Sequence, residues 1–238
     1  MKKIFFVLVV LCCASSSRAQ NEIVVDPNAS VRILSGAYNA IKVSGGINLY
    51  LSQSDNMAIA VSAANENYKE GIKTVIENGT LKIFYDGEKN WHKKDRKLRA
   101  YVSFSNLNKL DASGACDVVV AGSLTVTALE MRMSGACDFT GKVNVNTLKL
   151  NLSGASDVQI TGAANTVNIE SSGASDVKGF GLVTDFCNAN ISGASDVNIT
   201  VNKELNAAAS GSSDIKYKGT AVVNKHSSSG ASSISKAN

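Results

Sequence analysis

The sequence is poor in residues that break or enlarge a fold: it has one proline, one tryptophan and 6% aromatic residues in 238. A single proline excludes a collagen-like or proline-rich chain, and so few rings disfavour a core built on aromatic side chains. After residue 19 no apolar run is long enough to cross a membrane as a helix. The core must therefore be packed with small and β-branched side chains.

The start of the chain is typical of an export signal. Lys2 and Lys3 precede an apolar stretch over residues 4–14, and small residues follow it up to Ala19. The sequence predicts a signal peptide over residues 1–19, with cleavage after Ala19.

Two cysteines fall inside this signal and three outside it. Cys12 and Cys13 leave a lipoprotein signal as an alternative, although they are not preceded by the Gly, Ala or Ser that lipidation signals carry. The mature chain keeps Cys116, Cys137 and Cys187, an odd number in a compartment that permits disulfides.

The charge of the mature chain is close to neutral. Of the 24 lysines and arginines, Lys2, Lys3 and Arg18 leave with the signal, so 21 basic residues face 20 acidic ones. A nucleic-acid-binding protein carries a strongly basic surface. This balance therefore argues against nucleic acid as a partner.

A five-residue motif, Ser-Gly-Ala-Ser-Asp or a close variant, occurs seven times in the second half of the chain. Its glycines are 18 to 21 residues apart. A unit this short is too small for a propeller blade and suits one coil of a parallel β-solenoid, which must stack on its neighbours to bury its inner face. The motifs begin at Ser113, Ser134, Ser153, Ser172, Ser192, Ser210 and Ser229.

The residues around each motif alternate between apolar and polar, which is the period of a strand and not of a helix. In the third copy the alternation places one set inward and its neighbours outward, and the glycine is included in the inward set. The set predicted to face the core is Leu148, Leu150, Leu152, Gly154, Ser156, Val158 and Ile160. We therefore predict an all-β fold, a right-handed parallel β-helix.

In this register Cys116 and Cys137 occupy the same inward position of adjacent coils. Their Cα atoms would lie about 4.8 Å apart, which a disulfide accepts. Cysteine also packs well as a small buried apolar residue. Both a bond and two free thiols remain open.

The pattern continues upstream in a degenerate form. Residues 44–49 match Ser-Gly-Ala-Ser-Asp-Val position for position, Asn78-Gly79 indicates a hairpin turn, and residues 98–104 read as another strand. We divide the mature chain into a mixed-β N-terminal region with degenerate coils and a hairpin, residues 20–112, and a regular solenoid of about seven repeats, residues 113–238.

Together, the Gly-Gly-Ile-Asn segment at residues 45–48, the hairpin at residues 78–83, residues 106–110 and the motif array resemble the head GIN domain family, also described as auto-transporter adhesins. The resemblance implies an exported β-helical protein of Gram-negative bacteria with a role in adhesion. Its location would be periplasmic, associated with the outer membrane, or extracellular. The resemblance supplies no catalytic residues.

The aspartates of the motif should form a ladder of carboxylates on one surface. Their mutual repulsion could be relieved by raised pKa values, by bridging calcium, or by hydrogen bonds from turn amides. With one Asp per turn, structural hydrogen bonding is favoured over metal binding, and we predict no metal site. The ladder comprises Asp117, Asp138, Asp157, Asp176, Asp196 and Asp214.

The Ser, Ala and Asp positions of the motif would also form a flat, regular strip. Such a strip suits a repetitive partner: a surface polysaccharide, another envelope protein, or the same strip on a second copy of the chain. The alternative is that small residues are what a tight bend between stacked strands tolerates.

One dense basic cluster lies between predicted strands. Trp91, Lys93, Lys94 and Arg96 could hold an anionic glycan or a lipid headgroup, with the indole stacking on a sugar ring. The alternative is a solvated loop.

No nucleophile and base are brought together by spacing, and no cofactor motif occurs, so we predict a non-catalytic protein. Our first hypothesis is an adhesin-like surface or envelope protein that presents a flat repetitive face for glycan or protein binding. The alternatives are a glycan-active β-helix enzyme and a purely structural envelope component.

Overall fold

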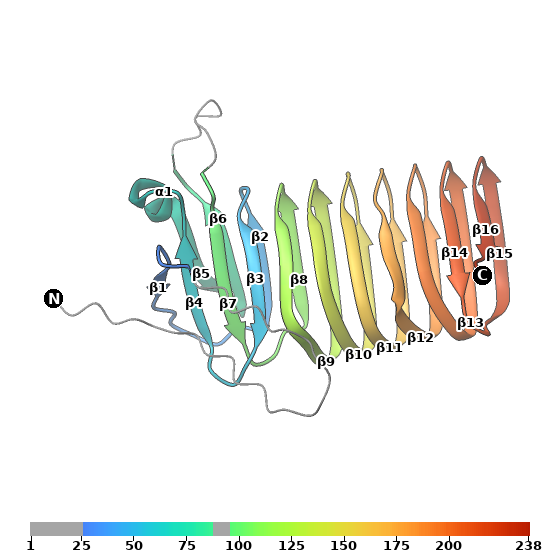
Figure 1. Cartoon of the computed structure of the whole chain (residues 1–238), viewed down its shortest axis with the longest axis horizontal. Helices are drawn as coiled ribbons and strands as arrows, with labels where there is room; N and C mark the ends of the chain where they lie inside the picture. The colour runs from blue at the N-terminus through green and yellow to red at the C-terminus, as the bar shows by residue number, and fades with distance from the viewer. Residues whose placement is uncertain (1–25, 88–95) are drawn as a thin grey trace.

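The computed structural model describes residues 26–87 and 96–238, and these residues form an elongated stack of β-coils (Figure 1). Neighbouring strands in the regular part are all parallel. The elements are β1 (Ser30–Arg32), β2 (Ala40–Ser44), β3 (Asn48–Gln53), β4 (Ala58–Ser62), α1 (Glu66–Gly71), β5 (Ile72–Glu77), β6 (Thr80–Tyr85), β7 (Arg99–Phe104), β8 (Lys109–Gly114), β9 (Asp117–Gly135), β10 (Asp138–Leu152), β11 (Asp157–Ser171), β12 (Val177–Ile191), β13 (Asp196–Gly211), β14 (Asp214–Lys218), β15 (Val222–Gly230) and β16 (Ser233–Lys236).

Each regular coil has one stretch that runs toward the Ser-Gly-Ala turn and one that runs away from it. We call the layer of approaching stretches the entry sheet and the layer of departing stretches the exit sheet. The long strands β9 to β13 each begin in the exit sheet and end in the entry sheet. Pairing with the next coil continues on both sides of the bend, with register shifts in the β9–β10, β11–β12 and β12–β13 pairs. The predicted β-solenoid is confirmed.

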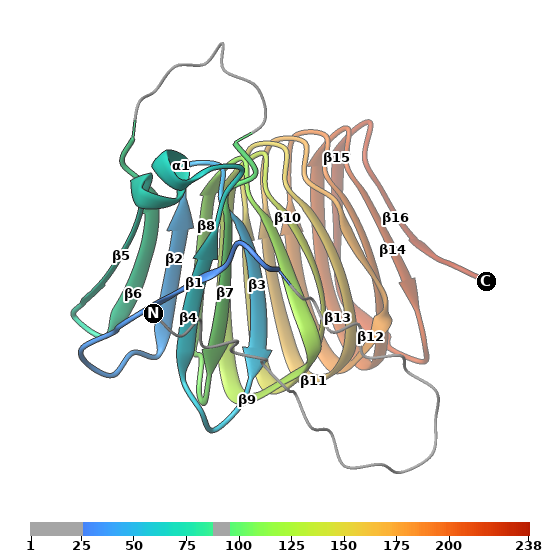
Figure 2. The ribbon, with the colours of Figure 1, turned by 60° about the vertical axis from the view of Figure 1, so that its left-hand side comes forward.

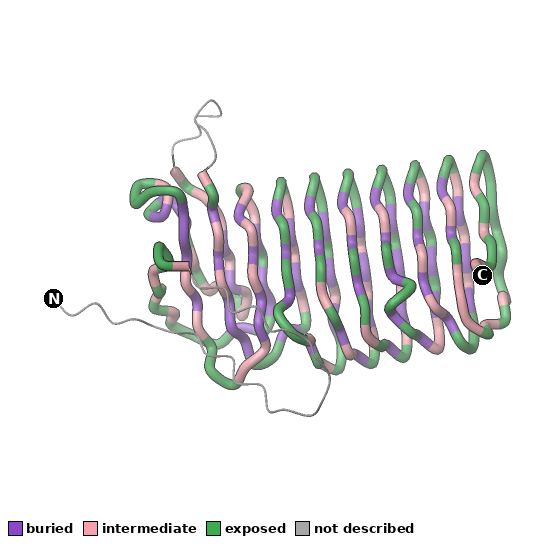
Figure 3. Tube along the Cα trace, viewed as in Figure 1, coloured by how far each residue is buried: buried purple, intermediate pink, exposed green. Residues whose placement is uncertain are grey.

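The repeats stack in the predicted register. Asp138 pairs with Asp117 on one side and Asp157 on the other, and Leu150 lies between Met131 and Ile169. The inward side chains are buried between the two sheets, while the tight turns at the edge are exposed (Figure 3).

The inward placement of the motif glycine was wrong. Gly154 is exposed and has a φ of +81°, so the strict alternation breaks at the turn and resumes at the fully buried Ser156. The glycine adopts the left-handed conformation that reverses the chain direction, which a residue with a Cβ adopts only with strain.

The degenerate motif at residues 44–49 does form a coil, and it stacks directly on the first regular one. Strand β2 pairs with β8, and β3 pairs with β9. On its other side the same coil pairs with β6 and β7, which come later in the chain. The order of coils in space therefore differs from their order in the sequence.

Antiparallel strands cover the N-terminal end of the stack (Figure 2). Strand β5 pairs with β6, β4 with β7, and β1 with β4, all antiparallel. The predicted hairpin joins β5 to β6, and both residues of its turn have positive φ, 50° at Asn78 and 70° at Gly79. Among the described residues no helix has the length and apolar character to cross a membrane.

The fourth position of the motif forms a polar row inside the core. The backbone N–H of Ser156 donates to Oγ of Ser175, and the N–H of Ser195 donates to Oγ of Ser213, at 3.2 Å each. The serines are fully buried, so these bonds satisfy groups that water cannot reach.

The first two regular coils carry cysteine in this row. Cys116 and Cys137 are buried and free, as is Cys187 elsewhere in the core. The hydrogen bond to Cys116 and burial raise the pKa of the Cys137 thiol, and burial raises that of Cys187 to about 12. The thiols of Cys137 and Cys187 are therefore protonated at neutral pH.

Candidate functional site

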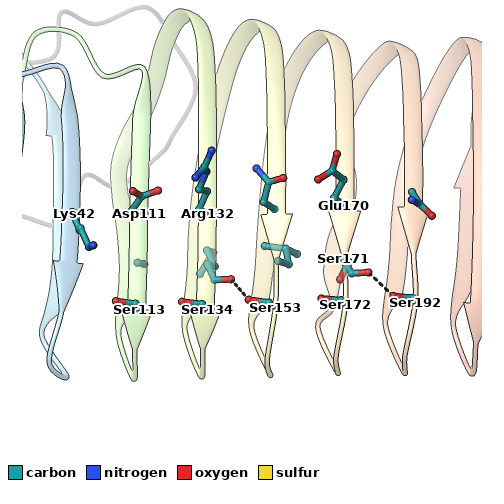
Figure 4. A pocket seen from close by; sticks show the side chains of 15 residues that line it. Lys42, Asp111, Ser113, Arg132, Ser134, Ser153, Glu170, Ser171, Ser172 and Ser192 are labelled. Carbon is teal, nitrogen blue, oxygen red and sulfur yellow. Dashed lines mark hydrogen bonds between the residues drawn. The ribbon is translucent and has the colours of Figure 1, made fainter.

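A shallow groove of about 590 Å³ runs along the entry sheet, across the coils, beside the tight turns (Figure 4). It is formed by the last outward positions of each coil before its turn. Its lining residues are Lys42, Asp111, Ala112, Ser113, Arg132, Met133, Ser134, Asn151, Leu152, Ser153, Glu170, Ser171, Ser172, Asn190 and Ser192.

One row of the lining lies two residues before the motif serine and changes its chemistry at every coil. The register aligns Lys42 with Asp111, Asp111 with Arg132, and so on along the stack. Figure 4 shows the labelled members of this row side by side on successive strands. In spatial order they are Lys42, Asp111, Arg132, Asn151, Glu170 and Asn190.

Part of this row is held by a neighbouring carboxylate. Glu130 accepts hydrogen bonds from Nε and Nη2 of Arg132, at 3.0 and 2.9 Å, and from Nδ2 of Asn151 at 3.4 Å. The pKa of Arg132 is raised by its hydrogen bond to Glu130. The guanidinium is therefore fixed along the sheet surface.

Asp111 is held by Lys109, which the register aligns with Glu130 of the next coil. Nζ of Lys109 lies 3.6 Å from Oδ2 of Asp111, whereas Oδ1 is enclosed and accepts no hydrogen bond from the described residues. The carboxylate of Asp111 is thus held by Lys109 through one oxygen, and its other oxygen is covered by protein.

The second row of the lining is the serine ladder of the motif. Oγ of Ser153 donates to the carbonyl of Met133 at 3.4 Å, and Oγ of Ser192 donates to that of Ser171 at 3.5 Å. Each of these hydroxyls can still accept a hydrogen bond from a ligand. The serines therefore form a hydroxyl-bearing wall beside the charged row.

The structure places the aspartate ladder on the exit sheet, away from this groove. Asp117, Asp138 and Asp157 pair in register, as do Asp196 and Asp214, and Asp176 directly precedes Val177, which pairs with Val158 and Val197. Asn48 contacts the ladder at one end, and Ser233 pairs with Asp214 at the other. Nδ2 of Asn48 donates to Asp117 at 2.8 Å, Nζ of Lys178 lies 2.8 Å from Asp157, and Oγ of Ser233 donates to Asp214 at 2.7 Å.

Hydrogen bonding from turn amides, which the sequence favoured, occurs at one rung. The N–H of Asp214 donates to Oδ1 of Asp196 at 3.1 Å. Within residues 26–87 and 96–238 no group of three or more His, Cys, Asp or Glu side chains is arranged to hold a metal ion.

The Ser, Ala and Asp positions of the motif, which the sequence predicts to form a flat strip, instead form the edge where the entry sheet meets the exit sheet. The motif serines pair within the entry sheet, as Ser113 does with Ser134, and the aspartates pair within the exit sheet, as Asp117 does with Asp138. The two rows therefore lie on opposite flanks of the tight turn, because the glycine between them reverses the chain. They do not form one plane.

Of the basic cluster, Arg96 is described, and Trp91, Lys93 and Lys94 lie outside the described residues. Cζ of Arg96 lies 4.6 Å from the centroid of the Tyr85 ring, a cation–π contact. The side chain of Arg96 is therefore packed against the end of β6.

The charged row of the groove was missed by sequence reasoning. Asn151 was assigned outward correctly, but no feature of the alternation distinguishes it from other outward residues. The available signal is the charge change from coil to coil at the position two residues before the motif serine.

Comparisons with known proteins agree with this architecture. Residues 37–221 match the model of the family described as "Putative auto-transporter adhesin, head GIN domain". A crystal structure of a "putative adhesin" from Bacteroides fragilis superimposes with a TM-score of 0.81 at 21% identity, covering 89% of this chain and 98% of that one.

Two Parabacteroides structures are also similar. One from Parabacteroides distasonis, named a "putative lipid binding protein", gives a TM-score of 0.66 at 20% identity over 90% of this chain and 98% of its own. A "putative adhesin" from Parabacteroides merdae gives 0.62 at 19% over the same shares. At these identities the likeness establishes the fold. No curated protein matches the sequence.

Proposed function

Because the chain belongs to the head GIN domain family, we propose that it is an exported, adhesin-like binding protein that holds an extended polymer along the groove of its entry sheet. The observation that carries this proposal is the direction of the groove, which crosses six coils. A linear ligand lying in the groove meets one residue of the charged row and one motif serine on each coil, about every 4.8 Å.

Binding without catalysis is supported by the spacing of the acidic groups in the groove. Asp111 and Glu170 are the two carboxylates of the lining, and Arg132 and Asn151 lie on the coils between them. Three coil spacings separate them by about 14 Å. Glycoside hydrolysis needs two carboxylates within roughly 10 Å, so this pair suits contact with a ligand and not cleavage.

Cell fractionation with surface protease treatment tests export. We expect the protein outside the cytoplasm, and exposure to protease on intact cells would favour an adhesive role at the surface. A cytoplasmic location would overturn the proposal.

Retention of residues 20–238 on immobilised envelope extract tests the groove. Glu170→Ala/Asn190→Ala removes two exposed groove side chains. The matched control, Gln159→Ala/Lys216→Ala, removes two exposed side chains of the exit sheet. We expect retention to fall with the groove variant only. Equal retention of both variants would contradict binding at this site, whereas no retention of the wild type would favour a purely structural protein.

A further inference from the structure

We propose that the polymer held in the groove is an uncharged glycan. This inference rests on the proposed function and names its ligand class. It follows from the charges of the lining, the groups already engaged within the protein, and the type of surface on which the groove lies.

The charges of the groove cancel and alternate. Two cations, Lys42 and Arg132, and two anions, Asp111 and Glu170, are the charged residues of the lining. Each anion follows a cation along the stack. A polyanion that crosses the coils would have to place charge beside Asp111 or Glu170, and a polycation would have to place it beside Lys42 or Arg132. Like-charge contacts of this kind exclude both types of ligand.

The guanidinium that would recruit an anion is already occupied. Two hydrogen bonds of Arg132 go to Glu130, so a ligand carboxylate would have to displace an internal partner. The groove therefore lacks the free arginine fork that selects carboxylates and phosphates.

Free hydrogen-bonding groups of both kinds remain. The side chains of Lys42, Glu170 and Asn190 make no hydrogen bond or ion pair within the described part of the chain, and the amide oxygen of Asn151 is also unused. The row therefore offers donors and acceptors together, with serine hydroxyls beside it. Sugar hydroxyls donate and accept at the same carbon, which suits this mixture.

A peptide fits this surface poorly. The groove lies over the face of a sheet whose backbone groups are paired from coil to coil, so an extended peptide cannot add to it as a strand. The apolar lining residues Ala112, Met133 and Leu152 are 2%, 2% and 3% exposed. They form a closed floor without pockets for peptide side chains.

Calorimetry with defined oligosaccharides tests the inference. The neutral probes are hexamers of glucose, mannose and N-acetylglucosamine, and the anionic probe is hexagalacturonate, each at low and at physiological salt. We expect one or more neutral hexamers to bind with a Kd that changes less than about twofold with salt, because no counterions are released. Glu170→Ala/Asn190→Ala should weaken binding about tenfold, whereas Gln159→Ala/Lys216→Ala should leave it unchanged.

Two results would overturn the ligand class while leaving polymer binding intact. One is preferred binding of hexagalacturonate that weakens steeply with salt. The other is retention on envelope extract that protease treatment of the extract abolishes, with no hexamer bound, which would identify a protein partner. Loss of all retention would instead remove the proposed function itself.

Discussion

A Cβ placed on Gly154 would lie 2.4 Å from the carbonyl oxygen of Gly135 in the preceding coil. The same approach recurs at the motif glycines from Gly135 to Gly211, within 2.4 to 2.5 Å. Two constraints therefore act on each of these positions: a positive φ and direct backbone stacking. They can be separated, because Gly122 has a φ of +80° and no atom within 4 Å of its would-be Cβ.

Gly154→Ala should destabilise the protein more than Gly122→Ala. Both substitutions introduce left-handed strain of about 1–2 kcal/mol, but only the first forces adjacent coils apart, which we expect to add about 1–3 kcal/mol. Urea unfolding of both variants measures the difference. Equal losses of stability would show that strain alone, and not stacking, requires glycine in the motif.

Asp26 should make stability depend on pH at the N-terminal end. Burial raises the pKa of Asp26, but hydrogen bonds from Ser62, Tyr101 and the N–H of Asn28, together with Arg99, outweigh burial and hold it below the ordinary 3.8. A carboxyl whose folded pKa is depressed contributes stability above its unfolded pKa, and this contribution is lost as the pH falls through the folded value.

We therefore expect Asp26→Asn to cost roughly 1–3 kcal/mol at pH 7 and less at pH 3, because the contribution of the carboxylate is lost as the pH falls through its lowered folded pKa. Melting temperatures across this range provide the measurement. Asp55→Asn, at an exposed carboxyl, is the control and should have little effect at either pH. A penalty for Asp26→Asn that does not change with pH would show that the charge of Asp26 is not what stabilises this contact.

The aspartate ladder should contain stored repulsion at its centre. Asp176 directly precedes Val177, which pairs between Val158 and Val197, so the register places Asp176 between Asp157 and Asp196. Its carboxylate accepts no hydrogen bond from the described residues, and Lys178, which forms an ion pair with Asp157, is the cation that interacts with it. Removing one of three adjacent like charges with Asp176→Asn should stabilise the protein by about 0.2–1 kcal/mol at low salt. The gain should shrink in 0.5 M salt, which screens exposed charges.

Asp214→Asn is the comparison for this prediction. Asp214 has one aspartate neighbour and accepts a hydrogen bond from Ser233, so its substitution should give a smaller gain or a loss. Destabilisation by Asp176→Asn would mean that attraction to Lys178 outweighs the repulsion between the aspartates.

The sequence correctly predicted the features that depend on local periodicity, namely which strand residues face the core and where the hairpin turns. Alternation placed Leu150 and Ser156 inward correctly, and Asn78-Gly79 located the hairpin, because both signals lie within a few residues. The turn glycine was misassigned, since alternation describes a continuous strand and Gly154 reverses the chain.

The same reasoning could not predict features that depend on residues far apart in the sequence, such as the pairing of distant strands and the groove. Nothing local to β2 indicates that β6, a later strand, pairs on its outer side. Likewise, the outward position of Glu170 could be predicted, but its place in a groove depends on the curvature of the sheet and on the residues that register places beside it. The groove is therefore a property of stacking and not of any single repeat.

Two of the buried cysteines, Cys137 and Cys187, should respond differently to substitution by serine because their neighbours differ. Cys137 lies between Cys116 and Ser156, in the row where other coils carry serine, and its thiol donates to the carbonyl of Ser134 at 3.3 Å. Oγ of Ser156 makes the equivalent bond to Ser153 at 3.3 Å. Cys137→Ser should thus cost less than about 1 kcal/mol, because the new hydroxyl inherits an acceptor.

Cys187 lies between Val167 and Leu205 and donates no hydrogen bond to the described residues. Cys187→Ser would bury a hydroxyl without a partner, at a cost of about 1–3 kcal/mol. Urea unfolding of both variants tests this contrast, and thiol titration of the unfolded wild type without reductant should find three free thiols. A single thiol would reveal a disulfide, and Cys137→Ser would then be the more damaging change because it removes a crosslink between adjacent coils.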